Sequence, residues 1–213
     1  MIKVENIETW GFEHAIRGMR NPLNSWSRSD SSFGYEACSG EFVPDLKIDE
    51  NDLKLMRQLY VGGQPHRKYL RQIFAVMDIT APLYWWKEFD TYKVGTTANS
   101  CSTMHKIAAK EFSIEDFSDE HLETGWLACL DDTIIPLLNR ARTKFIATKD
   151  KRYWWQMIQL LPSSYNQRRT VSMTYENVMN MLDYREGHKL DEWREFCKIL
   201  KQLPYVEKIR DGR

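Results

Sequence analysis

The chain has 213 residues, 42% hydrophobic and 13% aromatic, so it is long enough to bury a substantial core. Its 30 lysine and arginine residues equal its 30 aspartate and glutamate residues, and this balance argues against bulk electrostatic binding of nucleic acid, although not against a local pocket for one phosphate. No apolar run approaches the roughly 20 residues that span a bilayer, which argues against a membrane-spanning protein.

The N-terminus and the cysteines bear on the compartment. The opening residues, MIKVENIETW, lack the continuous apolar stretch of a signal peptide, and we expect a cytoplasmic protein. The four cysteines are far apart and form no C-x-x-C pair, which argues against a zinc site and more strongly against a disulfide framework. Cys129 and Cys197 fall on apolar helix faces and are predicted to be reduced, buried thiols.

In the first half of the chain the sequence predicts one helix and one strand. Residues 20–50 are rich in Ser, Asn, Gly and Asp and are predicted to be irregular. A helix is expected from Asp49 to the glycine pair at 62–63. The run QIFAVMDIT, residues 72–80, alternates in a way typical of a strand with both faces partly covered. Pro82 then suits the first turn of a helix that carries PLYWWKEFDTYKV.

The second half is predicted to be mostly helical. A long apolar stripe from about Asp119 to Phe145 indicates a helix that Pro136 should kink. KRYWWQMIQLL is predicted as a short helix, RRTVSMT as a second strand, and YENVMNMLDYREG and LDEWREFCKILKQL as the closing helices. Strands among long helices indicate an α+β fold.

Two segments are candidates for chemistry. The stretch YKVGTTANSCST, residues 92–103, replaces an aromatic helix by small hydroxyl, amide and thiol groups that contribute little to a core, so it is either a simple turn or a ligand-binding segment. On the helix after RRTVSMT, Asn177 and Asn180 lie three apart on one surface, and Arg185 lies about 140° further round. This helix presents either a solvated face or a ligand site. In such a site the side chain of Asn180 would hydrogen-bond to a heterocycle, and the guanidinium of Arg185 would donate two hydrogen bonds to a phosphate or a carbonyl.

The C-terminal segment resembles the flavin-dependent thymidylate synthases. That family continues from Leu-Pro through a strand into a helix with the pattern N-A-R-x-L-x-x-F-x-x-L-R, followed by H-A-Q-x-E-I-R. This chain has LP at 161–162, TYENVMNMLDYR at 174–185 and HKLDEWR at 188–194. Arg185 falls on the arginine of the family's Leu-Arg, and His188 falls on its histidine after a small gap. The remaining matches are Asn180, where many members carry Asn or His, and Glu192 and Arg194 on the Glu-Ile-Arg positions.

The first half resembles the family in layout. TAP at 80–82 matches its step from a strand into a helix, and with one gap Thr97, Asn99 and Ser102 fall on the S-x-N-x-x-S of its signature R-H-R-x-x-S-x-N-E-x-S-x-R-Y. Lys93 stands close to the second arginine of that signature. The resemblance implies that residues 92–103 form a nucleotide-and-flavin loop, and that His66 and Arg67 lie where the family contacts flavin.

The resemblance implies a single domain over residues 1–213, with a small antiparallel sheet flanked by long helices. It implies reductive methylation of deoxyuridylate (dUMP) to dTMP with FAD, NADPH and methylenetetrahydrofolate, in a homotetramer that needs no metal. Arg185 would hold and polarise the pyrimidine, and no protein nucleophile is required, so Cys101 is read as an unreactive loop thiol. Implied contacts to substrate are Arg185, Asn99, Cys101 and Ser102; those to the cofactor are Lys93, Thr97, Asn180 and His188.

Several positions depart from the family pattern. Thr91, Tyr92 and Lys93 occupy the Arg-His-Arg region, and Glu176 stands where the family has a basic residue. Negative charge on a ligand would then be met by other cations, for which the candidates are Lys93, Arg185, Arg168, Arg169, Arg17 and Arg20. The sequence therefore leaves three alternatives open: an enzyme with a rebuilt pocket, a non-catalytic relative that keeps the fold as a binding or structural module, and a related enzyme that acts on a different pyrimidine nucleotide.

Overall fold

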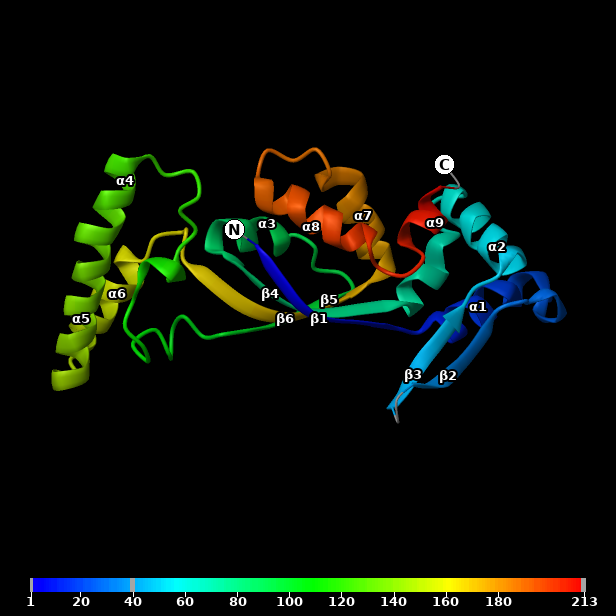
Figure 1. The fold of residues 1–213 in the computed structure, drawn as a ribbon, viewed down its shortest axis with the longest axis horizontal. Coiled ribbons are helices and arrows are strands. Elements are labelled where there is room, and N and C mark those ends of the chain that lie inside the picture. Colours follow the sequence, from blue (N-terminus) through cyan, green and yellow to red (C-terminus); the bar gives the residue numbers. More distant parts are fainter. Residues whose placement is uncertain (1, 39–40, 212–213) are drawn as a thin grey trace.

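The computed structural model describes residues 2–38 and 41–211, and for residues 35–38 and 41–45 it describes the backbone only. Its centre is a four-stranded antiparallel sheet in the order β1-β4-β6-β5 (Figure 1). The strands are β1 (Lys3–Trp10), β4 (Phe74–Pro82), β5 (Thr96–Ser100) and β6 (Asn166–Thr174). This arrangement confirms the predicted α+β fold with a small antiparallel sheet.

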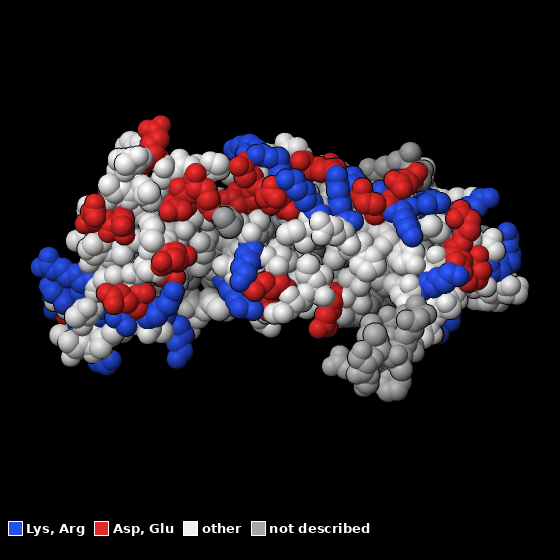
Figure 2. All heavy atoms as spheres, in the orientation of Figure 1, with Lys and Arg blue, Asp and Glu red and all other residues white. Residues whose placement is uncertain are grey.

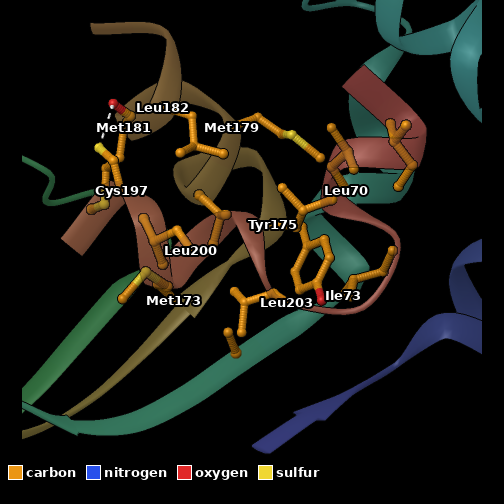
Figure 3. Close-up of a cluster of buried hydrophobic side chains, with 14 of the residues drawn as sticks. Leu70, Ile73, Met173, Tyr175, Met179, Met181, Leu182, Cys197, Leu200 and Leu203 are labelled. Carbon is orange, nitrogen blue, oxygen red and sulfur yellow. Dashed lines mark hydrogen bonds between the residues drawn. The ribbon is translucent and has the colours of Figure 1, made fainter. Parts of the chain in front are cut away.

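One face of this sheet is covered by helices. In Figure 1, α3 (Leu83–Phe89), α7 (Tyr175–Arg185) and α8 (Asp191–Lys201) lie on the same side of the strands. The predicted alternation of β4 is confirmed, because Ile73, Ala75, Met77 and Ile79 have no exposed surface. Figure 3 shows Met173, Leu182 and Cys197 in the core beneath α7 and α8, which includes Trp85, Trp86 and Trp193. Burial of such large apolar side chains stabilises the sheet and its helical layer.

The sheet is flanked at one end by α1 (Phe12–Arg20), α2 (Glu50–Val61) and α9 (Val206–Arg210), and by three 3₁₀ turns, Asn21–Leu23, Trp26–Arg28 and Arg67–Gln72. The prediction of α2 is confirmed at both ends, since Asp49 and Gly62 are its caps. The prediction that residues 20–50 are irregular is wrong in part. They contain a hairpin of β2 (Ser32–Cys38) and β3 (Glu41–Lys47), whose backbone pairing does not depend on an apolar face.

At the opposite end of the sheet, α4 (Thr124–Cys129), α5 (Ile135–Thr148) and α6 (Lys151–Leu160) enclose a second, smaller core. A 3₁₀ turn, Ile114–Asp116, precedes this helical lobe. A kink was predicted at Pro136. The structure has a π-helical turn, Leu130–Ile134, just before it, where proline removes a helical hydrogen bond. Cys197 is buried as predicted, whereas the prediction of burial is wrong for Cys129, which is exposed. Whether the two cores form one cooperative domain over residues 1–213 stays a prediction.

Residues 92–103 are not a simple bend. From Thr96 to Ser100 they form β5, the edge strand of the main sheet, paired with β6. The composition of residues 92–103 does not predict this strand, because an edge strand is held by backbone hydrogen bonds and needs no apolar side chains. All but the first residue of β5 are exposed.

Candidate functional site

Arg185, the predicted catalytic residue, is the last residue of α7 and its side chain is held from several sides. Its Nε donates to the hydroxyl of Tyr92 at 3.1 Å, and its Nη1 lies 3.0 Å from a carboxylate oxygen of Glu88. The guanidinium lies 5.0 Å from the ring centroid of Trp193, a cation–π contact. With 18% of the side chain exposed, the guanidinium is fixed in orientation but still open to a ligand.

His188 follows Arg185 in the turn between α7 and α8. Its Nδ1 accepts the backbone N–H of Leu190 at 3.2 Å, and its ring packs edge-on to Trp193. Burial, followed by the positive charge of Arg185, holds the pKa of His188 below its usual value. The neutral imidazole is therefore favoured at pH 7, with its Nε2 as the remaining donor.

The E-I-R match brings two further residues to this turn. Glu192 is buried and accepts a hydrogen bond from the hydroxyl of Tyr84, which ties α8 to α3. Arg194 donates to the backbone oxygen of His188 at 2.7 Å. Both side chains therefore position the α7–α8 turn, and neither was predicted to bind a ligand.

The entry to β5 is fastened to the start of α7. The side-chain amide of Asn177 donates to the backbone oxygen of Val94 at 2.7 Å and to the hydroxyl of Thr96 at 2.8 Å. Between them Gly95 has φ of +73°, and an added Cβ would lie 3.2 Å from Thr174. Glycine is needed here for the left-handed backbone conformation. Asn177 is therefore a structural residue that brings the candidate loop beside α7.

Further along β5 the predicted ligand contacts point away from α7. Directly opposed residues of an antiparallel pair share a face. Thr97 and Asn99 oppose Ser172 and Thr170, whereas the intervening residues of β6 are buried beneath α7. Thr97 and Asn99 thus lie on the sheet face opposite Arg185. Within one chain the structure does not bring these two predicted groups together.

The other predicted contacts lie beyond β5 or between these two groups. The backbone of Cys101 continues the sheet, with its N–H 2.9 Å from the oxygen of Arg168, and its thiol is exposed. The hydroxyl of Ser102 accepts the N–H of His105 at 2.9 Å, which caps a turn. Lys93 is exposed beside Tyr92, and Asn180 is half-buried on α7, where its side chain makes no hydrogen bond to a described residue.

Most of the candidate cations are already paired with carboxylates. The guanidinium of Arg168 lies 2.7 Å from Asp78 and that of Arg169 lies 2.7 Å from Asp90, while Arg185 pairs with Glu88 as described. Glu176, which replaces a basic family residue, is paired with Arg71 at 2.5 Å. Figure 2 shows positive and negative side chains intermingled along the upper edge of the molecule, where α7 and α8 lie.

A cavity of about 640 Å³ opens between α1 and the 3₁₀ turn at residues 67–72. It falls within the usual range of small-molecule sites. His66 and Lys68 contribute polar and cationic groups, and Tyr69 and Leu59 contribute apolar walls. Among the sequence-based matches only His66 lines this cavity. It was placed by the family layout, and no spacing pattern in the sequence identifies the other lining residues.

No group of three or more His, Cys, Asp or Glu side chains within residues 2–34 and 46–211, where side chains are described, is arranged to hold a metal ion. In the same part of the chain, no helix is both long enough and apolar enough to cross a membrane.

No family model and no curated protein sequence matches the chain. Among the solved structures that resemble it over almost its whole length are two of thymidylate synthase X from Helicobacter pylori with FAD and dUMP. One has 16% sequence identity and a TM-score of 0.68, and the alignment covers 100% of this chain and 99% of that chain. The other has 16% identity and a TM-score of 0.68, with 99% of each chain covered. These similarities confirm the expected fold.

Proposed function

We propose that the chain is a flavin-dependent thymidylate synthase-like protein that binds dUMP and transfers a one-carbon unit to it from methylenetetrahydrofolate, with NADPH as the reductant and FAD as the cofactor. The observation that carries this proposal is the similarity over the whole length to structures that hold FAD and dUMP. The proposal assigns the turn around Arg185 to the pyrimidine nucleotide. It assigns the cavity beside His66 to the planar ring system of the flavin, because the resemblance places His66 where the family contacts flavin.

The arrangement around Arg185 suits recognition of a pyrimidine. A guanidinium that is already held by Tyr92 and Trp193 loses little conformational entropy when it donates to a carbonyl or phosphate oxygen. The neutral imidazole of His188 offers one additional donor nearby. These residues would bind and orient the ligand without forming a covalent bond to it.

A shared site with Thr97 and Asn99 requires a second copy of the chain. Those residues lie on the sheet face opposite Arg185, so one chain cannot place them on the same ligand. We propose a homo-oligomer, a tetramer as the family resemblance implies, in which β5 of one copy approaches the α7–α8 turn of another. Light scattering after size-exclusion chromatography tests this part directly, and a monomer would contradict it.

The arginines near the candidate site suit a pyrimidine better than they suit the pyrophosphate of FAD. In the described part of the chain, Arg168, Arg169 and Arg185 each have a carboxylate partner, so a pyrophosphate would compete with the chain's own anions. This pairing favours a second candidate function, a non-catalytic relative that binds a nucleotide or serves a structural role. In that case the fold is kept and flavin chemistry is lost.

Two measurements separate these candidates. An enzyme should show flavin absorbance between 400 and 500 nm and release tritium from labelled dUMP when NADPH and methylenetetrahydrofolate are present. A thermal-shift panel over FAD, dUMP and folates tests binding alone, since a ligand at 100 times its Kd stabilises the native state by about 2.7 kcal/mol. Binding of dUMP without flavin uptake or tritium release would support the non-catalytic candidate, and binding of none of these ligands would exclude both nucleotide proposals.

The Arg185→Ala variant tests the site itself. It should lose dUMP binding, whereas Arg140→Ala, an exposed arginine on the distant α5, should not. Glu88→Gln is the complementary change, because it releases Arg185 from its ion pair and should strengthen the binding of an anionic nucleotide. Equal affinity for dUMP in the wild type and in Arg185→Ala would show that Arg185 is not part of the dUMP site.

A further inference from the structure

The outer edge of β5 is the feature that carries an inference about the assembly. In the sheet order β1-β4-β6-β5, β1 and β5 are the two edge strands. At one end of β5, the N–H of Thr174 on β6 donates to the oxygen of Gly95 at 3.1 Å. At the other end, the N–H of Cys101 donates to the oxygen of Arg168 on β6 at 2.9 Å. Because bonded and non-bonded positions alternate along an antiparallel strand, the odd-numbered residues from 95 to 101 bond to β6.

The even-numbered residues of β5 present a row of outward-facing backbone groups. The N–H and C=O groups of Thr96, Ala98 and Ser100 point away from β6, and they make no hydrogen bond to a described residue beyond the sheet. Every residue from Thr97 to Cys101 is exposed, so no described segment of the chain covers this edge.

The opposite edge of the sheet, β1, is protected in ways that β5 is not. β1 has a shift of register between Glu5 and Glu8, and Lys3 adds a third charge along it. β5 contains neither a charged residue nor a proline, and it pairs with β6 without a shift of register. Charges, prolines and bulges are the features that keep edge strands from pairing with another chain. The edge of β5 is therefore a template for a further strand.

The residues of β5 suit a second copy of the same strand. When two copies lie antiparallel about a two-fold axis at Ala98, Thr96 of each lies opposite Ser100 of the other, and Thr97 lies opposite Asn99. All the outward-facing residues then exchange backbone hydrogen bonds, about six in total. Any shift of this register leaves fewer bonds within β5. Side chains that face each other are hydroxyls, amides or alanine, so no like charges meet.

An exposed apolar side chain beside this edge supports the contact. Val94 comes two residues before β5 and is 87% exposed, the highest value among the large apolar side chains of the described residues. In the register centred on Ala98, Val94 lies beside the end of the second copy's β5. Removing this apolar surface from water favours the pairing.

We propose that the chain associates by pairing β5 with β5 of a second copy, in the register centred on Ala98. The two four-stranded sheets then form one sheet of eight strands. This contact uses the backbone edge of β5, whereas the contact proposed for the nucleotide site uses its side-chain face. A tetramer with dihedral symmetry needs more than one two-fold contact, and this pairing supplies one of them. It requires no nucleotide or flavin, so the inference does not depend on the proposed function.

Cysteine cross-linking without ligand tests the register. The background is the full chain without three of its four thiols, which requires Cys38→Ser, Cys101→Ser and Cys129→Ser. In this background Ala98→Cys places two thiols at the axis, where Cα atoms about 5.5 Å apart allow a disulfide. Ser100→Cys is the matched control, because it is exposed on the same edge but lies roughly 14 Å from its copy along the paired strands.

Under mild oxidation Ala98→Cys should form a covalent dimer on a non-reducing gel, with a yield at least about tenfold above that of Ser100→Cys. Absence of this dimer would overturn the proposal. Equal yields from the two variants would also overturn it, because they would indicate random collision and not a fixed register.

The variant Ala98→Pro tests the hydrogen bonds themselves. It removes an outward N–H and keeps every bond from β5 to β6. Light scattering after size-exclusion chromatography should give half the wild-type mass, whereas Ala98→Ser, which retains the N–H, should give the wild-type mass. Circular dichroism checks that both variants are folded. A monomeric wild type, or an unchanged mass in folded Ala98→Pro, would overturn the proposal. Binding of dUMP is measured separately, so failure of the proposed function leaves these outcomes unaffected.

Discussion

Asp52 connects three segments that are far apart in the sequence, and its replacement gives the sharpest test of how the α1–α2 end of the fold is held together. The side chain lies in the first turn of α2 and has no exposed surface. Its carboxylate accepts five hydrogen bonds, from Arg20 Nε at 2.6 Å, Ser29 Oγ at 2.8 Å, Asp30 N at 3.0 Å, Ser31 N at 3.0 Å and Ser31 Oγ at 2.7 Å.

The change Asp52→Ala should destabilise the fold by about 3–5 kcal/mol, because it leaves the guanidinium of Arg20 buried without a counter-charge. Native proteins are stable by only about 5–15 kcal/mol, so a large part of the total would be lost. For a chain of this length, 1 kcal/mol corresponds to about 2–4 °C in Tm. The expected fall in Tm is therefore roughly 6–20 °C.

Urea unfolding followed by circular dichroism measures this loss, with the midpoint falling and the slope unchanged. The double variant Asp52→Leu with Arg20→Met is the control, since replacing both charges by apolar groups should recover much of the stability. A loss below about 1 kcal/mol in Asp52→Ala, which is the value of a surface pair, would refute the argument that this pair is buried and structural.

The pair also predicts a dependence on pH. Burial by itself raises the pKa of Asp52, but the hydrogen bonds from Ser31, Ser29 and Arg20 outweigh it and hold this pKa below its usual value. A carboxyl with a depressed folded-state pKa contributes stability that is present above its unfolded pKa, near 3.9, and is lost as the pH falls through the folded value. Stability in Asp52→Ala should therefore depend less on pH in this acidic range than stability in the wild type.

Three further predictions concern the candidate site and the core. Asn177→Ala should destabilise the chain by about 1–3 kcal/mol and speed hydrogen exchange at the start of β5, because two hydrogen bonds to that segment are lost; unchanged exchange would contradict this. His188 should titrate below its usual pKa when followed by nuclear magnetic resonance. Arg185→Gln should raise that pKa because it removes a nearby positive charge, and an unchanged pKa would show that the charge of Arg185 does not act on His188. Burial raises the pKa of Cys197 to about 11, so this thiol should resist alkylation in the native state whereas the exposed Cys101 reacts, as peptide mass mapping can show.

Local sequence patterns predicted the elements whose signals lie within a few residues. The alternation of β4, the caps of α2 and the helical periodicity of α7 and α8 were all readable, and the structure confirms them. Other elements gave no such signal. The hairpin β2–β3 and the edge strand β5 are held by backbone hydrogen bonds to other segments, which side-chain composition does not encode.

The sequence by itself determined the types of chemical groups available, namely an arginine at the end of a long helix and a run of small polar residues after an aromatic helix. Only the tertiary structure decided which partners those groups have. The burial of Arg20 against Asp52, the pairing of Arg185 with Glu88 and the placement of Thr97 on the far face of the sheet all depend on strand register and helix packing. The physical reason is that a one-residue change in register reverses the face of every side chain, and electrostatic pairing follows distance in space and not distance along the chain.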